Sequence, residues 1–109
     1  MLPSERELWA GRESGLVKQI LRWLKKEGIF HYKIHGGQFQ KVGLPDIVIH
    51  HKGVTIYIEV KNKKGVVSKI QEKVMGELRA AGVYVGVARN LYQAQDIVIN
   101  AGVLKGENQ

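Results

Sequence analysis

The chain contains no cysteine, which excludes disulfide frameworks, cysteine zinc sites and thiol nucleophiles together. It has only two prolines, and no apolar run approaches the roughly 18 residues that a membrane-spanning helix needs. The first seven residues carry no positively charged segment followed by an apolar one, so no secretion signal is predicted. Together these absences favour a cytoplasmic protein that does not enter a membrane.

Acidic residues are also scarce. Ten Asp and Glu stand against 17 Lys and Arg, which gives a formal net charge of +7 at pH 7. Such a balance indicates a polyanionic partner, of which nucleic acid is the commonest. An ordinary soluble protein with many surface lysines would show the same charge, so charge alone does not decide. Because no repeat or low-complexity linker interrupts the chain, we expect a single domain over residues 1–109.

The spacing of apolar and turn residues predicts the order helix, three strands, helix, strand, helix. Capping boxes begin the first two helices at Ser4 and Ser68, and Gly28 and Gly82 end them. The predicted helices cover residues 4–27, 68–81 and 91–100, and the predicted strands cover residues 29–35, 46–51, 54–61 and 83–88. The last two strands flank a helix, so they should be parallel. The expected fold is a small α/β domain with a mixed sheet and helices on both faces.

Two carboxylates in the middle of the chain carry the strongest sign of chemistry. Only Lys52 and Gly53 separate two strand-like segments, which is typical of a β-hairpin. If that turn has two residues, Asp46 lies directly opposite Glu59 on the neighbouring strand. Opposed carboxylates repel each other and destabilise a sheet unless a cation lies between them. Oxygen ligands of this kind suit magnesium or manganese.

Lys61 shares a face of its strand with Glu59, because side chains alternate along a strand. Phosphodiester cleavage uses a metal to activate water and to neutralise charge on the phosphate, and a cation beside the attacking water assists it. Alternatively, Glu59 and Lys61 form only a surface ion pair, as Glu-x-Lys sequences often do. The Gly-Leu-Pro sequence before Asp46 and its register with Glu59 favour a catalytic site.

Several short motifs, taken together, resemble the VRR-NUC (virus-type replication–repair) nucleases of the PD-(D/E)XK superfamily. The resemblance extends over about residues 4–90. Its motifs are Gly43-Leu44-Pro45-Asp46, Glu59-Val60-Lys61, Gln71, Gly82 and Val87-Ala88-Arg89. It implies a restriction-endonuclease-like αβββαβ core and metal-dependent cleavage of DNA. One departure is Asn90, which stands where the family pattern has a second arginine.

The resemblance also implies roles for individual residues. Asp46, Glu59 and the carbonyl group of Val60 would bind the metal, which is expected to be Mg²⁺ with Mn²⁺ able to substitute. Lys61 would position or activate the attacking water. Gln71 would lie beside the active site and contact the scissile phosphate or its water. Independently of the family, Gln71 is also the fourth residue of a capping box, and both interpretations stay open.

Glu13 is a further candidate metal ligand. On a helical wheel it falls in the apolar stripe beside Leu16 and Val17, where a carboxylate is costly unless something pairs with it. It would either reach the metal site or pair with a lysine. Four lysines close to Lys61 in the sequence are candidates for binding DNA phosphates, although a cluster of lysines is usually only a solvated surface. These lysines are Lys63, Lys64, Lys69 and Lys73.

These observations predict a magnesium-dependent endodeoxyribonuclease. A chain of this length leaves little room for a separate target-recognition domain, so branched DNA, flaps or four-way junctions are the expected substrates. Symmetric cleavage of a four-way junction needs two active sites, which would make the protein a homodimer with a role in DNA repair. The alternatives are a non-catalytic nucleic-acid-binding module on the same fold and an RNA-processing nuclease.

Overall fold

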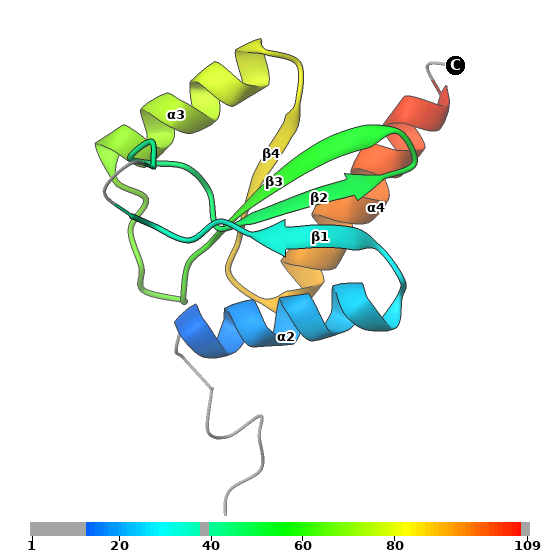
Figure 1. The fold of residues 1–109 in the computed structure, drawn as a ribbon, viewed down its shortest axis with the longest axis horizontal. Coiled ribbons are helices and arrows are strands. Elements are labelled where there is room, and N and C mark those ends of the chain that lie inside the picture. The colour runs from blue at the N-terminus through cyan, green and yellow to red at the C-terminus, as the bar shows by residue number, and fades with distance from the viewer. Residues whose placement is uncertain (1–12, 38–39, 108–109) are drawn as a thin grey trace, which may run out of the picture.

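The computed structural model describes residues 13–37 and 40–107 and contains one four-stranded mixed sheet in the order β1-β2-β3-β4 (Figure 1). β1–β2 and β2–β3 are antiparallel, whereas β3–β4 is parallel. The elements are α2 (Glu13–Lys26), β1 (Phe30–Lys33), β2 (Ile47–His51), β3 (Val54–Val60), α3 (Lys69–Ala80), β4 (Tyr84–Ala88) and α4 (Leu91–Glu107). This arrangement confirms the predicted α/β fold, with its parallel crossover through α3.

The turn between β2 and β3 sets the register of the site. Lys52 and Gly53 have φ angles of 51° and 78°, so both central residues are left-handed, as a two-residue type I′ hairpin requires. His51 pairs with Val54, and the register continues to Ile47 opposite Ile58. The predicted two-residue turn is therefore confirmed, even though a lysine occupies a position that favours Asn or Gly.

The two faces of the sheet are covered unequally. One face carries the main core, in which isoleucines of β2 and β3 such as Ile49 and Ile56 pack against α2 and α4. The other face is covered by α3, which packs against β4 at one side of the sheet (Figure 1). Glu59 belongs to this second face, because its neighbour Val60 points into the main core. Of the helices in the described residues, α3 is therefore the one that covers the face carrying Glu59.

Some predicted boundaries were wrong. β2 begins at Ile47 and not at Asp46, and β1 is shorter than the predicted strand over residues 29–35. The last helix continues to Glu107, seven residues beyond its predicted end. The predicted capping box at Ser4 lies outside the described residues. None of the helices in the described part of the chain is long and apolar enough to cross a membrane.

Candidate active site

Asp46 lies immediately before β2, where the ladder between β2 and β3 ends. Its amide donates to the carbonyl oxygen of Ile58 (3.0 Å), and its own carbonyl accepts from the amide of Ile34 (2.7 Å). The first bond is offset by one residue from the ladder, so Asp46 and Glu59 do not form the predicted pair of opposed strand residues. The backbone is nevertheless held from both sides, which fixes where the Asp46 side chain starts.

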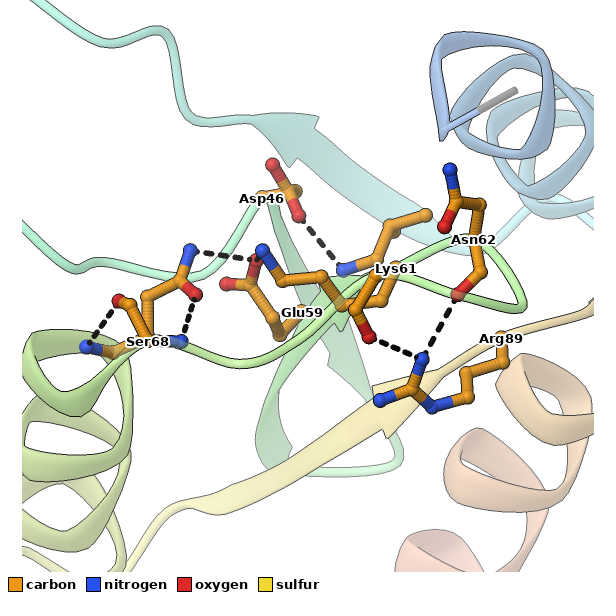
Figure 2. A network of polar contacts seen from close by, with 9 residues as sticks. Asp46, Glu59, Lys61, Asn62, Ser68 and Arg89 are labelled. Carbon is orange, nitrogen blue, oxygen red and sulfur yellow. Dashed lines mark hydrogen bonds and ion pairs between the residues drawn. The ribbon is translucent and has the colours of Figure 1, made fainter. Parts of the chain in front are cut away.

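The Asp46 carboxylate is directed at the end of β3. Its Oδ2 accepts a hydrogen bond of 2.7 Å from the amide of Val60, the residue that follows Glu59 in the chain (Figure 2). A charged acceptor on a backbone amide makes a short, strong bond. This bond holds the Asp46 carboxylate close to Glu59 despite the offset in register. Val60 itself is the residue between Glu59 and Lys61, so its backbone also belongs to the site.

Glu59 is the one charged side chain buried in the described part of the chain, with 2% of its surface exposed. Its Oε1 accepts from Nε2 of Gln71 at 3.1 Å and lies 3.8 Å from Nζ of Lys61. Its Oε2 is buried and has no hydrogen-bond partner among the described residues. An unpartnered buried oxygen of this kind is costly, and the ligand it needs is a cation or a donor.

The pKa of Glu59 is raised to about 8, mainly by burial and next by repulsion from Asp46. The positive charge of Lys61 lowers this pKa in part. The closeness of the Asp46 side chain and the charge of Glu13 also contribute to the raised pKa of Glu59. In the absence of a cation, therefore, this pair of carboxyl groups retains a proton at neutral pH. A divalent cation would displace that proton and stabilise both charges.

We predict that the metal-free protein loses stability as pH rises from about 4.5 to 8. The folded state keeps the Glu59 proton up to a pKa near 8, whereas the unfolded chain releases it near 4.5. The contribution is therefore complete below pH 4.5 and is lost as pH rises through this window. Melting curves in EDTA should show the decline, and Glu59→Gln should flatten it. Parallel wild-type and Glu59→Gln profiles would contradict the assignment.

Gln71 forms the predicted capping box and also lies beside the carboxylate pair. Ser68 and Gln71 form the predicted capping box at the start of α3, in which Gln71 Oε1 accepts from the Ser68 amide at 2.9 Å. Because the carbonyl oxygen of the side chain is used there, its Nε2 group is free to point at Glu59. The cap of α3 thus fixes the orientation of Glu59, and Figure 2 shows both sets of bonds together.

Glu13, the first residue of α2, lies beside the loop that follows Lys61. A Cβ atom added to Gly65 would come within 3.1 Å of Glu13 Oε2 and 3.3 Å of the Lys61 side chain. Glu13 is half-buried, and its charge acts on Glu59. The structure thus places it close to the carboxylate pair. Its role as a metal ligand is taken up below as a proposal.

Arg89, at the end of β4, holds the same loop from the other side. Its Nη1 donates to the carbonyl oxygens of Asn62 (2.9 Å) and Gly65 (2.6 Å), as Figure 2 shows for the arginine and Asn62. Sequence reasoning gave Arg89 only as a family motif and assigned it no contact. Asn90 accepts a hydrogen bond from the Gln93 amide at 2.8 Å and so caps α4. The helix cap gives a local reason for an asparagine at this position.

We predict that Arg89→Ala slows cleavage by roughly 10- to 100-fold, because small misplacements of reacting groups can have effects of that size. The loop after Lys61 would lose both bonds, while the residues proposed to react remain. Arg79→Ala is the matched control, because Arg79 likewise donates to a backbone carbonyl, that of Val85 in β4, and is exposed. Single-turnover rates and melting temperatures should be measured for both. Equal rates for the two variants would contradict a positioning role for Arg89.

The four lysines proposed to bind DNA are exposed. Lys63 and Lys64 stand in the loop directly after Lys61, and Lys69 and Lys73 stand one turn apart on α3, the helix that contributes Gln71. Their chain positions therefore adjoin the carboxylate pair. Within residues 13–37 and 40–107, no group of three or more His, Cys, Asp or Glu side chains is arranged to hold a metal ion. A metal here would depend on two carboxylates with backbone, water or phosphate oxygens, as Mg²⁺ sites often do.

Comparison with known proteins gives the family of the chain. The family model of the VRR-NUC domain matches residues 2–90. The chain belongs to the VRR-NUC family. A solved VRR-NUC domain has a TM-score of 0.67 and 21% sequence identity, with 82% of this chain and 96% of that chain covered. No curated protein matches by sequence.

A second solved structure is Hjc, a Holliday junction resolvase from the archaeal hyperthermophile Archaeoglobus fulgidus. Its TM-score is 0.54 and its identity is 25%, over 71% of this chain and 67% of that chain. The VRR-NUC match and this second likeness together support a nuclease on a small mixed sheet flanked by helices. They also support the predicted family and fold class.

Proposed function

We propose that this VRR-NUC chain is a metal-dependent endodeoxyribonuclease whose catalytic residues are Asp46, Glu59 and Lys61. The observation that carries the proposal is the buried, unpartnered Oε2 of Glu59, with Asp46 on one side and Lys61 on the other. A purely structural carboxylate would have a partner for each oxygen. Here one oxygen is held by Gln71 and Lys61, and the other is left for a ligand.

The residues present fit a divalent cation, Mg²⁺ with Mn²⁺ as a substitute. Asp46, Glu59 and the Val60 carbonyl group would hold it, with Glu13 contributing directly or through water. When bound, such an ion supplies Lewis acidity to water and to the phosphate. Binding of the ion would relieve the repulsion between the two carboxylates and so stabilise the folded protein.

The remaining residues act on the substrate and on the water. Lys61 places a positive charge beside the carboxylate pair, where it orients the attacking water and stabilises negative charge on the phosphate. Gln71 fixes the rotamer of Glu59 and presents its amide toward the same space, so it also contacts the phosphate or its water. Lys63, Lys64, Lys69 and Lys73 bind flanking phosphates and give an affinity that falls with added salt.

The proposed substrate is branched DNA, such as flaps or four-way junctions. The likeness to a Holliday junction resolvase supports this choice. Two symmetric cuts in a four-way junction require two active sites, so we also propose a homodimer in that reaction and a role in DNA repair.

One substrate panel tests the proposal. Labelled linear, flapped and four-way DNA, together with RNA of the same sequences, should be incubated with wild type in magnesium and resolved on denaturing gels. We expect cleavage of the branched DNA first, with RNA resistant. Preferential cleavage of RNA would replace the proposal with an RNA-processing enzyme. Binding of the same DNA without any cleavage in magnesium or manganese would leave only a binding module.

A further inference from the structure

The face of the sheet that carries Glu59 continues across β2 and β1 as an aromatic surface. Phe30 and Tyr32 of β1 and His50 of β2 form a cluster with ring centroids 5.7–6.3 Å apart. Phe30 is 66% exposed and Tyr32 is 48% exposed. We call these three residues the aromatic cluster. Large rings exposed together on one face are unusual for surface residues and mark a binding surface.

The register connects this cluster with the active site. Phe30 pairs with His50, and Tyr32 pairs with Val48, which in turn pairs with Tyr57. Tyr57 is two residues before Glu59, so both point to the same face. The rings and the carboxylate therefore lie along one face of the sheet.

A groove on this face begins at Tyr32 of the aromatic cluster. Its lining includes Tyr32, Val48 and Tyr57 from the sheet, together with Lys33, His35 and Leu44 from β1 and the chain beyond it. Among the helices of residues 13–37 and 40–107, α3 packs against β4 at the other side of the sheet, and none packs on β1 from this face (Figure 1). His50 is held by a hydrogen bond of 3.2 Å between its Nδ1 and Thr55 Oγ1. Tyr32 and Tyr57 therefore line the groove, and the cluster extends from Tyr32 to Phe30 and His50 outside it.

We propose that the aromatic cluster and its groove bind unpaired nucleotides of the DNA substrate, next to the scissile phosphate. Stacking on exposed aromatic rings is a usual means of binding single strands, because every base has a face that can stack, and the net charge of +7 favours contact with the phosphates. Continuity with the Glu59 face gives the strand a path from cluster to catalytic site. This inference rests on the proposed nuclease function and names its substrate as DNA with a single-stranded segment at the cut.

Binding should be measured by fluorescence anisotropy with the Lys61→Ala protein in magnesium, which holds DNA without cutting it. The probes are a blunt duplex and the same duplex with a single-stranded tail on either end. We expect Phe30→Ala and Tyr32→Ala each to weaken binding of the tailed duplex by about tenfold, with blunt-duplex binding little changed. Phe30→Tyr and Tyr32→Phe should retain the preference for a tail.

Tyr92→Ala is the matched control. Tyr92 is 80% exposed and belongs to α4, which packs on the opposite face of the sheet. A fluorescent adenine analogue placed in the tail should be quenched by stacking in the parent protein and in Tyr92→Ala, and less so in Phe30→Ala. Melting curves verify that each variant is folded.

Two results would overturn the inference. One is an unchanged tail preference in folded Phe30→Ala and Tyr32→Ala proteins. The other is conversion of a dimer to monomers by these substitutions without any effect on the tail, which would make this face a contact between two copies. Cleavage is scored separately in the Lys61-containing protein. Active enzyme with no tail preference refutes only this inference, and ring-dependent tail binding without cleavage refutes only the nuclease.

Discussion

Replacing Lys61 by alanine is expected to abolish cleavage while the affinity for DNA stays within a few fold of wild type. Lys61 Nζ lies 3.8 Å from Glu59 Oε1 and its side chain is only 13% exposed, so it serves the site rather than the solvent. Loss of one positioned charge or proton-transfer group typically slows an enzyme by roughly 10²- to 10⁴-fold. Exposed lysines nearby still bind phosphate, so affinity is largely kept.

The measurement pairs single-turnover rates with equilibrium binding of the same DNA. Lys73→Ala is the control, since this exposed lysine on α3 is proposed to bind phosphate only. It should weaken binding at moderate salt and leave the rate at saturating protein nearly intact. A Lys61→Ala protein that cuts at close to the wild-type rate would remove Lys61 from the mechanism.

The second large effect concerns Asp46. Magnesium or manganese should raise the melting temperature of wild type by several degrees, because an ion that binds only the folded state stabilises it. Asp46→Asn should lose most of this gain and nearly all cleavage. Without metal it should melt no lower than wild type, because the amide oxygen can still accept from Val60 and the repulsion of Glu59 is gone.

Asp96→Asn serves as the control for this experiment. Asp96 is exposed on α4, which packs against the opposite face of the sheet, and its replacement should leave both the metal-dependent stabilisation and cleavage unchanged. If Asp46→Asn is stabilised by metal as strongly as wild type, the ion binds elsewhere. If Asp46→Asn melts far below wild type in EDTA, the residue is structural and the interpretation of Glu59 must change.

Much of the fold was predictable because its signals are local. The Lys52-Gly53 turn, the capping box at Ser68 and the glycines after α2 and α3 involve only neighbouring residues. The β-branched runs of β2 and β3 match a buried sheet. The register at Ile47 and Ile58 followed from the turn alone. From these local features alone, the sequence predicts that Asp46 and Glu59 lie close together.

The rest depended on contacts between distant residues. The offset of Asp46 arises because its amide bonds to Ile58 and its carbonyl to Ile34, a competition that no hairpin pattern specifies. The support that Arg89 gives to Asn62 and Gly65 joins the end of β4 to a loop more than twenty residues earlier. The aromatic cluster likewise requires knowing which strands are neighbours. Alternation within β1 alone showed only that Phe30 and Tyr32 share a face.

We propose that Asp46 and Glu59 would hold a divalent ion that DNA cleavage requires, and a magnesium titration of cleavage tests this most directly. Protein stripped with EDTA should be inactive on a labelled four-way junction. Activity should rise and saturate with added magnesium or manganese for wild type and Asp96→Asn, and stay near background for Asp46→Asn. Cleavage that persists in EDTA, or that Asp46→Asn recovers at the same magnesium concentration as wild type, would contradict the account.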